Sequence, residues 1–84
     1  MGGTWSVYLL RCGDGTLYCG IALDVAARVE THRCGKGARY TKGRGPLELV
    51  HVELCEDKSA ALRREREIKR MDRRSKLALM DRGK

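Results

Sequence analysis

The stretch "VYLLRCGDGTLYCG" at residues 7–20 indicates a β-hairpin, because two short apolar runs flank a turn that contains two glycines. Each run carries one tyrosine, Tyr8 and Tyr18, although the chain has only three tyrosines, one tryptophan and no phenylalanine. The two rings lie on one face of the hairpin only in certain strand registers. The length of the loop therefore decides whether the two phenols can act together.

Two loops fit the turn. A two-residue turn at Asp14–Gly15 would pair Arg11 with Tyr18 and place Tyr8 and Tyr18 on opposite faces. A three-residue loop over residues 13–15 is the alternative, with its last glycine in the left-handed conformation that a type I turn followed by a bulge requires.

The three-residue loop pairs Leu10 with Tyr18 and Tyr8 with Gly20, so that both tyrosines share one face. A slip of one residue exchanges the faces of a strand, so the sorting of side chains selects the register. We predict the three-residue loop because it collects an apolar set on the other face: Val7, Leu9, Leu17, Cys19 and Ile21.

Composition favours one small globular domain over residues 1–84. The formal net charge of +7 and the pI of about 9.6 favour a polyanionic partner such as DNA or RNA. No stretch is long and apolar enough for a membrane span, and "MGGTW" lacks the apolar core of a signal peptide, so we expect a cytoplasmic protein without a membrane partner. The four cysteines form no C-x-x-C pair, and we expect them to be small core or half-buried residues.

The pattern along the chain predicts the element order β-β-α-β-α-α. Strands are expected over residues 5–12, 16–22 and 47–54, the last of them apolar on both alternating sets and so covered on both faces. A helix is expected within "LDVAARVETHRCGKG", with Asp24 as its N-cap and Gly35 at its C-terminal end.

Two further helices are expected near the C-terminus. The longer runs from about Ala60 to about Asp72 with Ser59 as its cap, and a short one, "KLALMDR", follows a second cap at Ser75.

The first helix places Arg28 and His32 one turn apart beside Val25 and Val29, within an arc of roughly 100°. The two polar side chains either lie at the edge of the buried stripe with their stems packed or serve a functional site. Periodicity alone leaves both readings open.

The longer C-terminal helix places Glu65 in the middle of its apolar stripe, whereas Glu67 projects to the solvated face. A carboxylate in that position needs a partner, because burying it alone is costly. The partner is either a cation such as Arg28 or Lys69, or a hard metal ion such as Mg²⁺.

A basic loop rich in glycine covers residues 35–46, directly after the helix that carries Arg28 and His32. Glycines let backbone amides approach an anion, and the cations neutralise phosphates. We predict nucleic-acid binding by this loop and the preceding helix end through Arg33, Lys36, Arg39, Tyr40, Lys42 and Arg44.

The ordered set resembles the GIY-YIG nuclease superfamily, and the resemblance is closest to its small single-domain bacterial proteins. The two signatures stand here as "SVY" at residues 6–8 and "YCG" at residues 18–20, followed by Arg28, His32 and Glu65. The resemblance covers nearly the whole chain and implies an α+β fold, with a small three-stranded antiparallel sheet flanked by helices.

The resemblance also implies an endonuclease that hydrolyses phosphodiester bonds in DNA with one divalent ion, Mg²⁺ or Mn²⁺. Glu65 would ligate the metal, and Arg28 would stabilise charge on the scissile phosphate. Tyr18 or Tyr8 would position or deprotonate the attacking water, and His32 would assist proton movement or orient a tyrosine. For a tyrosine to act as the base, nearby cations must lower its pKa from about 10.

Two alternatives follow from departures from the family pattern. Some members use an asparagine after the glutamate helix, and this chain contains no asparagine. That absence favours a non-catalytic nucleic-acid-binding module. Larger members gain DNA specificity from an attached domain, so the third reading is an accessory subunit of a DNA repair complex whose protein partner supplies specificity.

Overall fold

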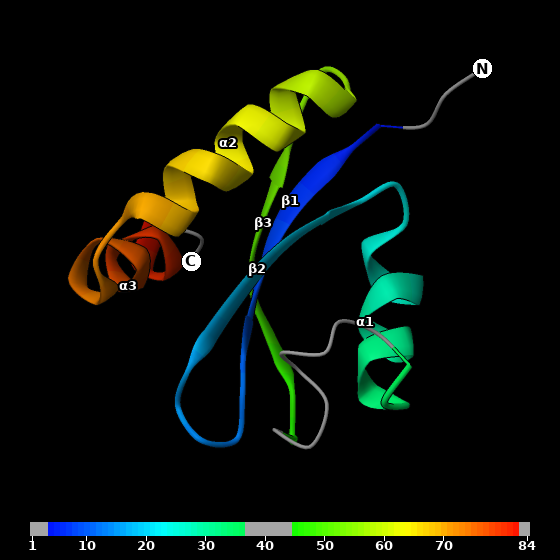
Figure 1. The fold of residues 1–84 in the computed structure, drawn as a ribbon, viewed down its shortest axis with the longest axis vertical. Helices are drawn as coiled ribbons and strands as arrows, with labels where there is room; N and C mark the ends of the chain where they lie inside the picture. The colour runs from blue at the N-terminus through cyan, green and yellow to red at the C-terminus, as the bar shows by residue number, and fades with distance from the viewer. Residues whose placement is uncertain (1–3, 37–44, 83–84) are drawn as a thin grey trace.

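The computed structural model describes residues 4–36 and 45–82, which form three strands and three helices in the predicted order (Figure 1). The sheet is antiparallel, with the strand order β2-β1-β3, and the predicted α+β architecture is confirmed. Among these residues no helix is both long and apolar enough to cross a membrane. The elements are β1 Ser6–Arg11, β2 Leu17–Ala22, α1 Val25–Arg33, β3 Glu48–Leu54, α2 Lys58–Arg70 and α3 Arg73–Arg82.

The hairpin has the three-residue loop. Tyr8 pairs with Gly20 across the two strands, which places Tyr8 and Tyr18 on the same face. The Gly15 N–H donates to the carbonyl of Cys12 at 2.9 Å, and Gly15 has a φ of +87°. The two-residue alternative is excluded, and the register predicted from side-chain sorting is confirmed.

The two faces of the sheet pack against different helices (Figure 1). One face packs against α2 and α3 through a cluster of Val7, Leu9, Cys19, Ala61, Ile68 and Leu79. The opposite face packs against α1 and the segment before β3 through Tyr8, Leu10, Cys12, Ala22, Val29 and Leu47. The two tyrosines of the hairpin therefore lie on the α1 side of the sheet.

The prediction that the third strand is covered on both faces is wrong. Leu49, Val52 and Leu54 of β3 are exposed by 38%, 43% and 77%. Leu49 lies opposite Leu10 and Val52 opposite Tyr8, so these side chains point to the α1 side. Because α1 contacts β2 at the far edge of the sheet, it leaves that face of β3 open.

The predicted ends of α1 are confirmed. The Asp24 side chain accepts a hydrogen bond from the Ala27 N–H at 3.0 Å. At the other end Gly35 has a φ of +77°, and the Lys36 N–H donates to the Thr31 carbonyl at 3.1 Å. This arrangement is the glycine-terminated end that satisfies the last carbonyl groups of a helix.

The predicted caps of the two C-terminal helices are wrong. Asp57, not Ser59, caps α2, with its carboxylate accepting from the Ala60 N–H at 2.8 Å. Asp72 does not end that helix but accepts from the Ser75 N–H at 2.8 Å, so it starts α3. Aspartate and serine are both good caps, and an aspartate also gains from the positive end of the helix dipole.

All four cysteines are free thiols. Cys12 and Cys19 are buried and Cys55 is half-buried, as predicted. Cys34 departs from the prediction and is exposed, because it caps the C-terminal end of α1.

An ion-pair network joins β3 to α2. Glu53 accepts from Arg64 Nε at 2.7 Å and Nη2 at 3.1 Å, and its Oε2 lies 2.7 Å from His51 Nε2. The hydrogen bonds from Arg64 hold the pKa of Glu53 below its ordinary value, against the opposing effect of burial and with a smaller contribution from His51.

We expect Glu53→Gln to destabilise the protein by about 1–3 kcal/mol at neutral pH, because Arg64 loses the closer of its two carboxylate partners. The folded-state pKa of Glu53 is lowered, so its contribution is present above the unfolded value of about 4.3 and is lost as the pH falls through the folded value. Urea unfolding at a series of pH values checks this. A gap between wild type and variant that does not shrink below about pH 4.3 would contradict the assignment.

The close approach of Tyr8 to Gly20 gives a second prediction. A Cβ at position 20 would lie 2.6 Å from Tyr8 Oη and 2.8 Å from its Cζ, so Gly20→Ala forces the ring to move. We expect a loss of about 1–3 kcal/mol in urea unfolding. Gly45→Ala is the matched control, because a Cβ there meets nothing within 4 Å. Equal stability of the two variants would show that the ring has room to relax.

Candidate active site

The hairpin holds two tyrosines side by side. The ring centroids of Tyr8 and Tyr18 lie 6.4 Å apart. Gly20 makes this possible, because a Cβ there would lie 2.6 Å from Tyr8 Oη and 3.1 Å from Tyr18 Cε2. The two phenol rings occupy the space that a side chain at position 20 would fill.

His32 joins the tyrosines from α1. The Tyr8 hydroxyl lies 2.8 Å from His32 Nε2, and the Tyr18 ring meets the imidazole nearly edge-on at 5.2 Å between centroids. His32 is 1% exposed, so both members of the Tyr8–His32 pair are buried. The contact between the Tyr8 hydroxyl and His32 Nε2 supports the expectation that His32 orients a tyrosine.

The protonation of the Tyr8–His32 pair follows from its burial. Burial raises the pKa of Tyr8 to about 12, with a further increase from Tyr18 and a decrease from Arg28. Burial also lowers the pKa of His32, and the positive charge of Arg28 lowers it further. At neutral pH Tyr8 is therefore protonated and the imidazole is neutral, and the tautomer of His32 sets which of the two groups donates the hydrogen bond.

Tyr18 does not have the lowered pKa that a tyrosine base requires. Burial raises its pKa, Lys69 and Arg28 oppose that rise, and the negative charge of Glu65 adds to it. At Tyr18 the effect of burial thus outweighs the opposing effects of Lys69 and Arg28. Both phenols stay protonated at neutral pH in this structure and can donate hydrogen bonds.

Arg28 lies on the exposed side of α1, one turn before His32. Its positive charge acts on Tyr8, Tyr18 and His32, as their shifted pKa values show. The side chain is therefore near the cluster while remaining open to solvent. An exposed guanidinium in this position is accessible to a phosphate.

Glu65 approaches from α2, on the other side of the sheet. Its side chain is 17% exposed, and its Oε2 lies 3.5 Å from Lys69 Nζ, so the pairing with Lys69 that the sequence left open is present. The negative charge of Glu65 raises the pKa of Tyr18. Tyr18 lies on the α1 side of the sheet, and because β2 is an edge strand, charged side chains of α2 act on it as well.

The described residues contain no group of three or more histidine, cysteine, aspartate or glutamate side chains placed to hold a metal ion. Mg²⁺ is held differently, by one or two carboxylates together with waters and substrate phosphates. The single half-buried carboxylate of Glu65 fits a magnesium or manganese ion of that kind.

The predicted nucleic-acid-binding residues fall partly within the described region. Arg33 pairs with Glu30 at 2.8 Å and donates to the Leu47 carbonyl at 3.3 Å, and it remains about half exposed. Lys36 is exposed. The other four lie outside the described residues: Arg39, Tyr40, Lys42 and Arg44.

Two cations lie beside Tyr18 that were not predicted there from the sequence, Lys69 and Lys76. A cavity along β2 is lined by Leu17, Tyr18, Cys19, Lys69 and Lys76. Nothing in the local pattern distinguishes Lys76 from the other basic residues near the C-terminus. Only the packing of α3 against the sheet brings it near β2.

Comparison with known proteins identifies the class to which this site belongs. Residues 4–78 match the GIY-YIG catalytic domain, and the chain therefore belongs to the GIY-YIG family. Within that family it is similar to bacterial UPF0213 proteins. A UPF0213 protein from Staphylococcus aureus strain Mu3 is 55% identical over 74 residues, which cover 88% of this chain and 90% of that protein.

Two solution NMR structures share the fold. A UPF0213 protein from Bacillus halodurans is 44% identical with a TM-score of 0.60, over 93% of this chain and 83% of that one. A protein from E. faecalis is 31% identical with a TM-score of 0.61, over 90% of this chain and 83% of that one.

The Tyr8–His32 pair gives a third prediction. We expect the pKa of His32 to lie below 6.5 and its Nε2 to be unprotonated at neutral pH. Imidazole ¹⁵N chemical shifts measured through a pH titration check both points. Tyr8→Phe is the control, because it removes the hydroxyl that donates to Nε2 while keeping the ring. A doubly protonated His32 at neutral pH would contradict the assignment.

Proposed function

We propose that this protein is a metal-dependent endonuclease that hydrolyses phosphodiester bonds in DNA, with structure-selective or weak sequence preference. One observation carries the proposal. Tyr8, Tyr18 and His32 form one contact cluster beside Arg28, and Glu65 reaches the same edge strand from the opposite side of the sheet. Membership of the GIY-YIG family and the net charge of +7 support the same conclusion.

The reaction breaks one P–O bond and forms another. The oxygen of a water molecule attacks phosphorus, the bridging oxygen leaves, and the products are a phosphate monoester and an alcohol. Negative charge develops on the phosphoryl oxygens, and the exposed guanidinium of Arg28 is placed to stabilise it.

The two phenols have different tasks in this proposal. Tyr18 is only half-buried, so its hydroxyl donates to and orients the attacking water or a phosphoryl oxygen. Tyr8 is buried against the neutral imidazole of His32. A proton that reaches the Tyr8 hydroxyl is passed to His32 Nε2, the imidazole nitrogen that lies 2.8 Å from it.

Glu65 would hold a Mg²⁺ or Mn²⁺ ion. Such an ion lowers the pKa of bound water and offsets charge on the phosphate. In its absence Lys69 pairs with Glu65, and the ion would compete with that pair. With one protein carboxylate, the affinity for metal alone should be weak and should increase when a nucleic acid adds its phosphates.

A non-catalytic nucleic-acid-binding module is the second candidate. It is favoured by the complete absence of asparagine, which some GIY-YIG nucleases use after the glutamate helix. This reading predicts DNA binding that does not depend on Glu65, with no turnover.

The fourth prediction separates the two candidates. In a cleavage assay on nicked and branched DNA with Mg²⁺ or Mn²⁺, Glu65→Gln should reduce the rate by about 10²-fold or more, because the metal loses its carboxylate. Glu67→Gln is the control. It makes the same change two residues away on the same helix, at a carboxylate that pairs with Arg64 at 3.3 Å on the exposed side.

Cleavage by wild type and Glu67→Gln, with little by Glu65→Gln, supports the endonuclease. Equal rates for all three proteins would contradict it, because the cleavage would then come from a different site or a contaminant. No cleavage by wild type, with salt-sensitive DNA binding retained, would support the binding module.

A further inference from the structure

Two adjoining cavities form a cleft between β2 and α3. One is lined by Thr16, Leu17, Arg73 and Lys76 and has a volume of about 210 Å³. The other, of about 410 Å³, is lined by Leu17, Tyr18, Cys19, Lys69 and Lys76. They share Leu17 and Lys76, so we treat them as one surface, the α3 cleft.

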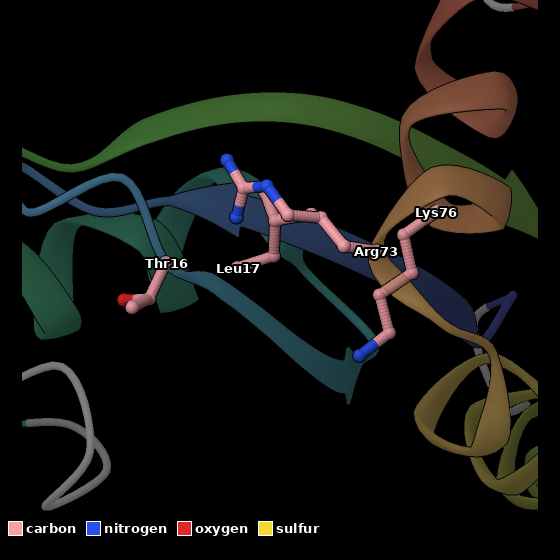
Figure 2. A pocket seen from close by; sticks show the side chains of 4 residues that line it. All are labelled: Thr16, Leu17, Arg73 and Lys76. Carbon is pink, nitrogen blue, oxygen red and sulfur yellow. The ribbon is translucent and has the colours of Figure 1, made fainter.

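The α3 cleft is strongly basic. Three of its lining side chains are cations, Lys69 from α2 and Arg73 and Lys76 from α3. Figure 2 shows Arg73 extending from α3 across Leu17, and the amino group of Lys76 pointing toward β2. None of the described residues that line the cleft is acidic, although Glu65 pairs with Lys69 at 3.5 Å next to it.

The hairpin holds one side of the cleft in place. Arg73 Nη1 donates to the Gly15 carbonyl at 2.8 Å, which ties the start of α3 to the hairpin loop. At the loop Asp14 accepts from the backbone N–H and hydroxyl of Thr16 at 3.0 and 2.6 Å. Those bonds fix the Asp14 carboxylate within the hairpin loop, and the three cations that line the cleft are Lys69, Arg73 and Lys76.

The cleft opens onto the candidate active site, because Tyr18 is one of its lining residues. The charge of Lys69 acts on Tyr18, and the charges of Lys69 and Lys76 act on Cys19, which follows Tyr18 on β2. A nucleic-acid strand that is bound across Tyr18 can therefore extend into the α3 cleft and stay in contact with the cations that line it.

We propose that the α3 cleft is a phosphate-binding subsite that holds the backbone of a nucleic-acid strand on one side of the scissile phosphate. This inference rests on the proposed function, because that function defines where the scissile phosphate lies relative to the cleft. Lysine ammonium groups contact phosphates without reading bases, so the cleft contributes affinity and register but no sequence preference. None of its lining residues is among those that the sequence analysis assigned to nucleic-acid binding.

A binding measurement without divalent ions tests the subsite independently of catalysis. The variant replaces both lysines, Lys69→Gln with Lys76→Gln, and the matched control, Arg66→Gln with Arg70→Gln, removes the same charge from exposed positions of α2 that do not line the cleft. The probe is a fluorescent nicked DNA duplex, and its anisotropy is followed at several salt concentrations. Lys69→Arg with Lys76→Arg is the conservative pair.

We expect the double glutamine variant of the cleft to bind about tenfold more weakly, and the slope of log K against log salt to fall by about two. The control pair should keep a slope close to that of wild type, and the arginine pair should retain the wild-type affinity. Equal losses in the cleft and control variants would overturn the proposal, because binding would then follow net charge alone. An unchanged affinity of the cleft variant would overturn it as well.

The binding test of the cleft and the cleavage test of the proposed function can fail independently. If wild type fails to cleave DNA, the loss of binding in the cleft variant still supports the subsite. If wild type cleaves DNA and the cleft variant binds normally, the endonuclease stands and the subsite is wrong.

Discussion

The close approach of Tyr8 to Gly20 across the β1–β2 pair is the constraint on which the site depends. A side chain at position 20 would collide with the Tyr8 hydroxyl, and a loop one residue shorter would turn Tyr8 and Tyr18 to opposite faces. With both conditions met, the Tyr8 hydroxyl reaches His32 at 2.8 Å and Tyr18 packs against the same imidazole. The register of the hairpin therefore also determines that Tyr8, Tyr18 and His32 come together.

The edge position of β2 gives that cluster access to both layers of helices. Tyr8 lies on the central strand, where it faces α1 and is buried. Tyr18 lies on the edge strand, where the charges of Arg28 from α1 and Glu65 from α2 both act on it. In the function proposed here, that position lets a carboxylate and a guanidinium from opposite sides of the sheet act at one phosphate.

The sequence predicted the features that depend on neighbouring residues. The face sorting of Val7, Leu9 and Cys19 selected the hairpin register, and Asp24 and Gly35 marked the ends of α1. Predictions failed where the choice depends on tertiary packing. Asp57 and Ser59 are both good caps, and β3 has an apolar pattern on both faces although α1 does not reach it. Lys76 was not predicted to lie near Tyr18, because only the docking of α3 brings it to β2.

The most direct test of the central claim, that Glu65 and Tyr18 belong to one metal-assisted site at the β2 edge, is a Mn²⁺ titration followed by NMR. The protein is saturated with a DNA duplex that carries a non-hydrolysable phosphate analogue, and paramagnetic line broadening is measured at each amide. The account predicts that broadening begins at residues around Glu65 and Tyr18 and spares His51 and Glu53, whose carboxylate is held by Arg64. Broadening that begins around Glu53, or that spreads evenly over the acidic surface, would contradict it.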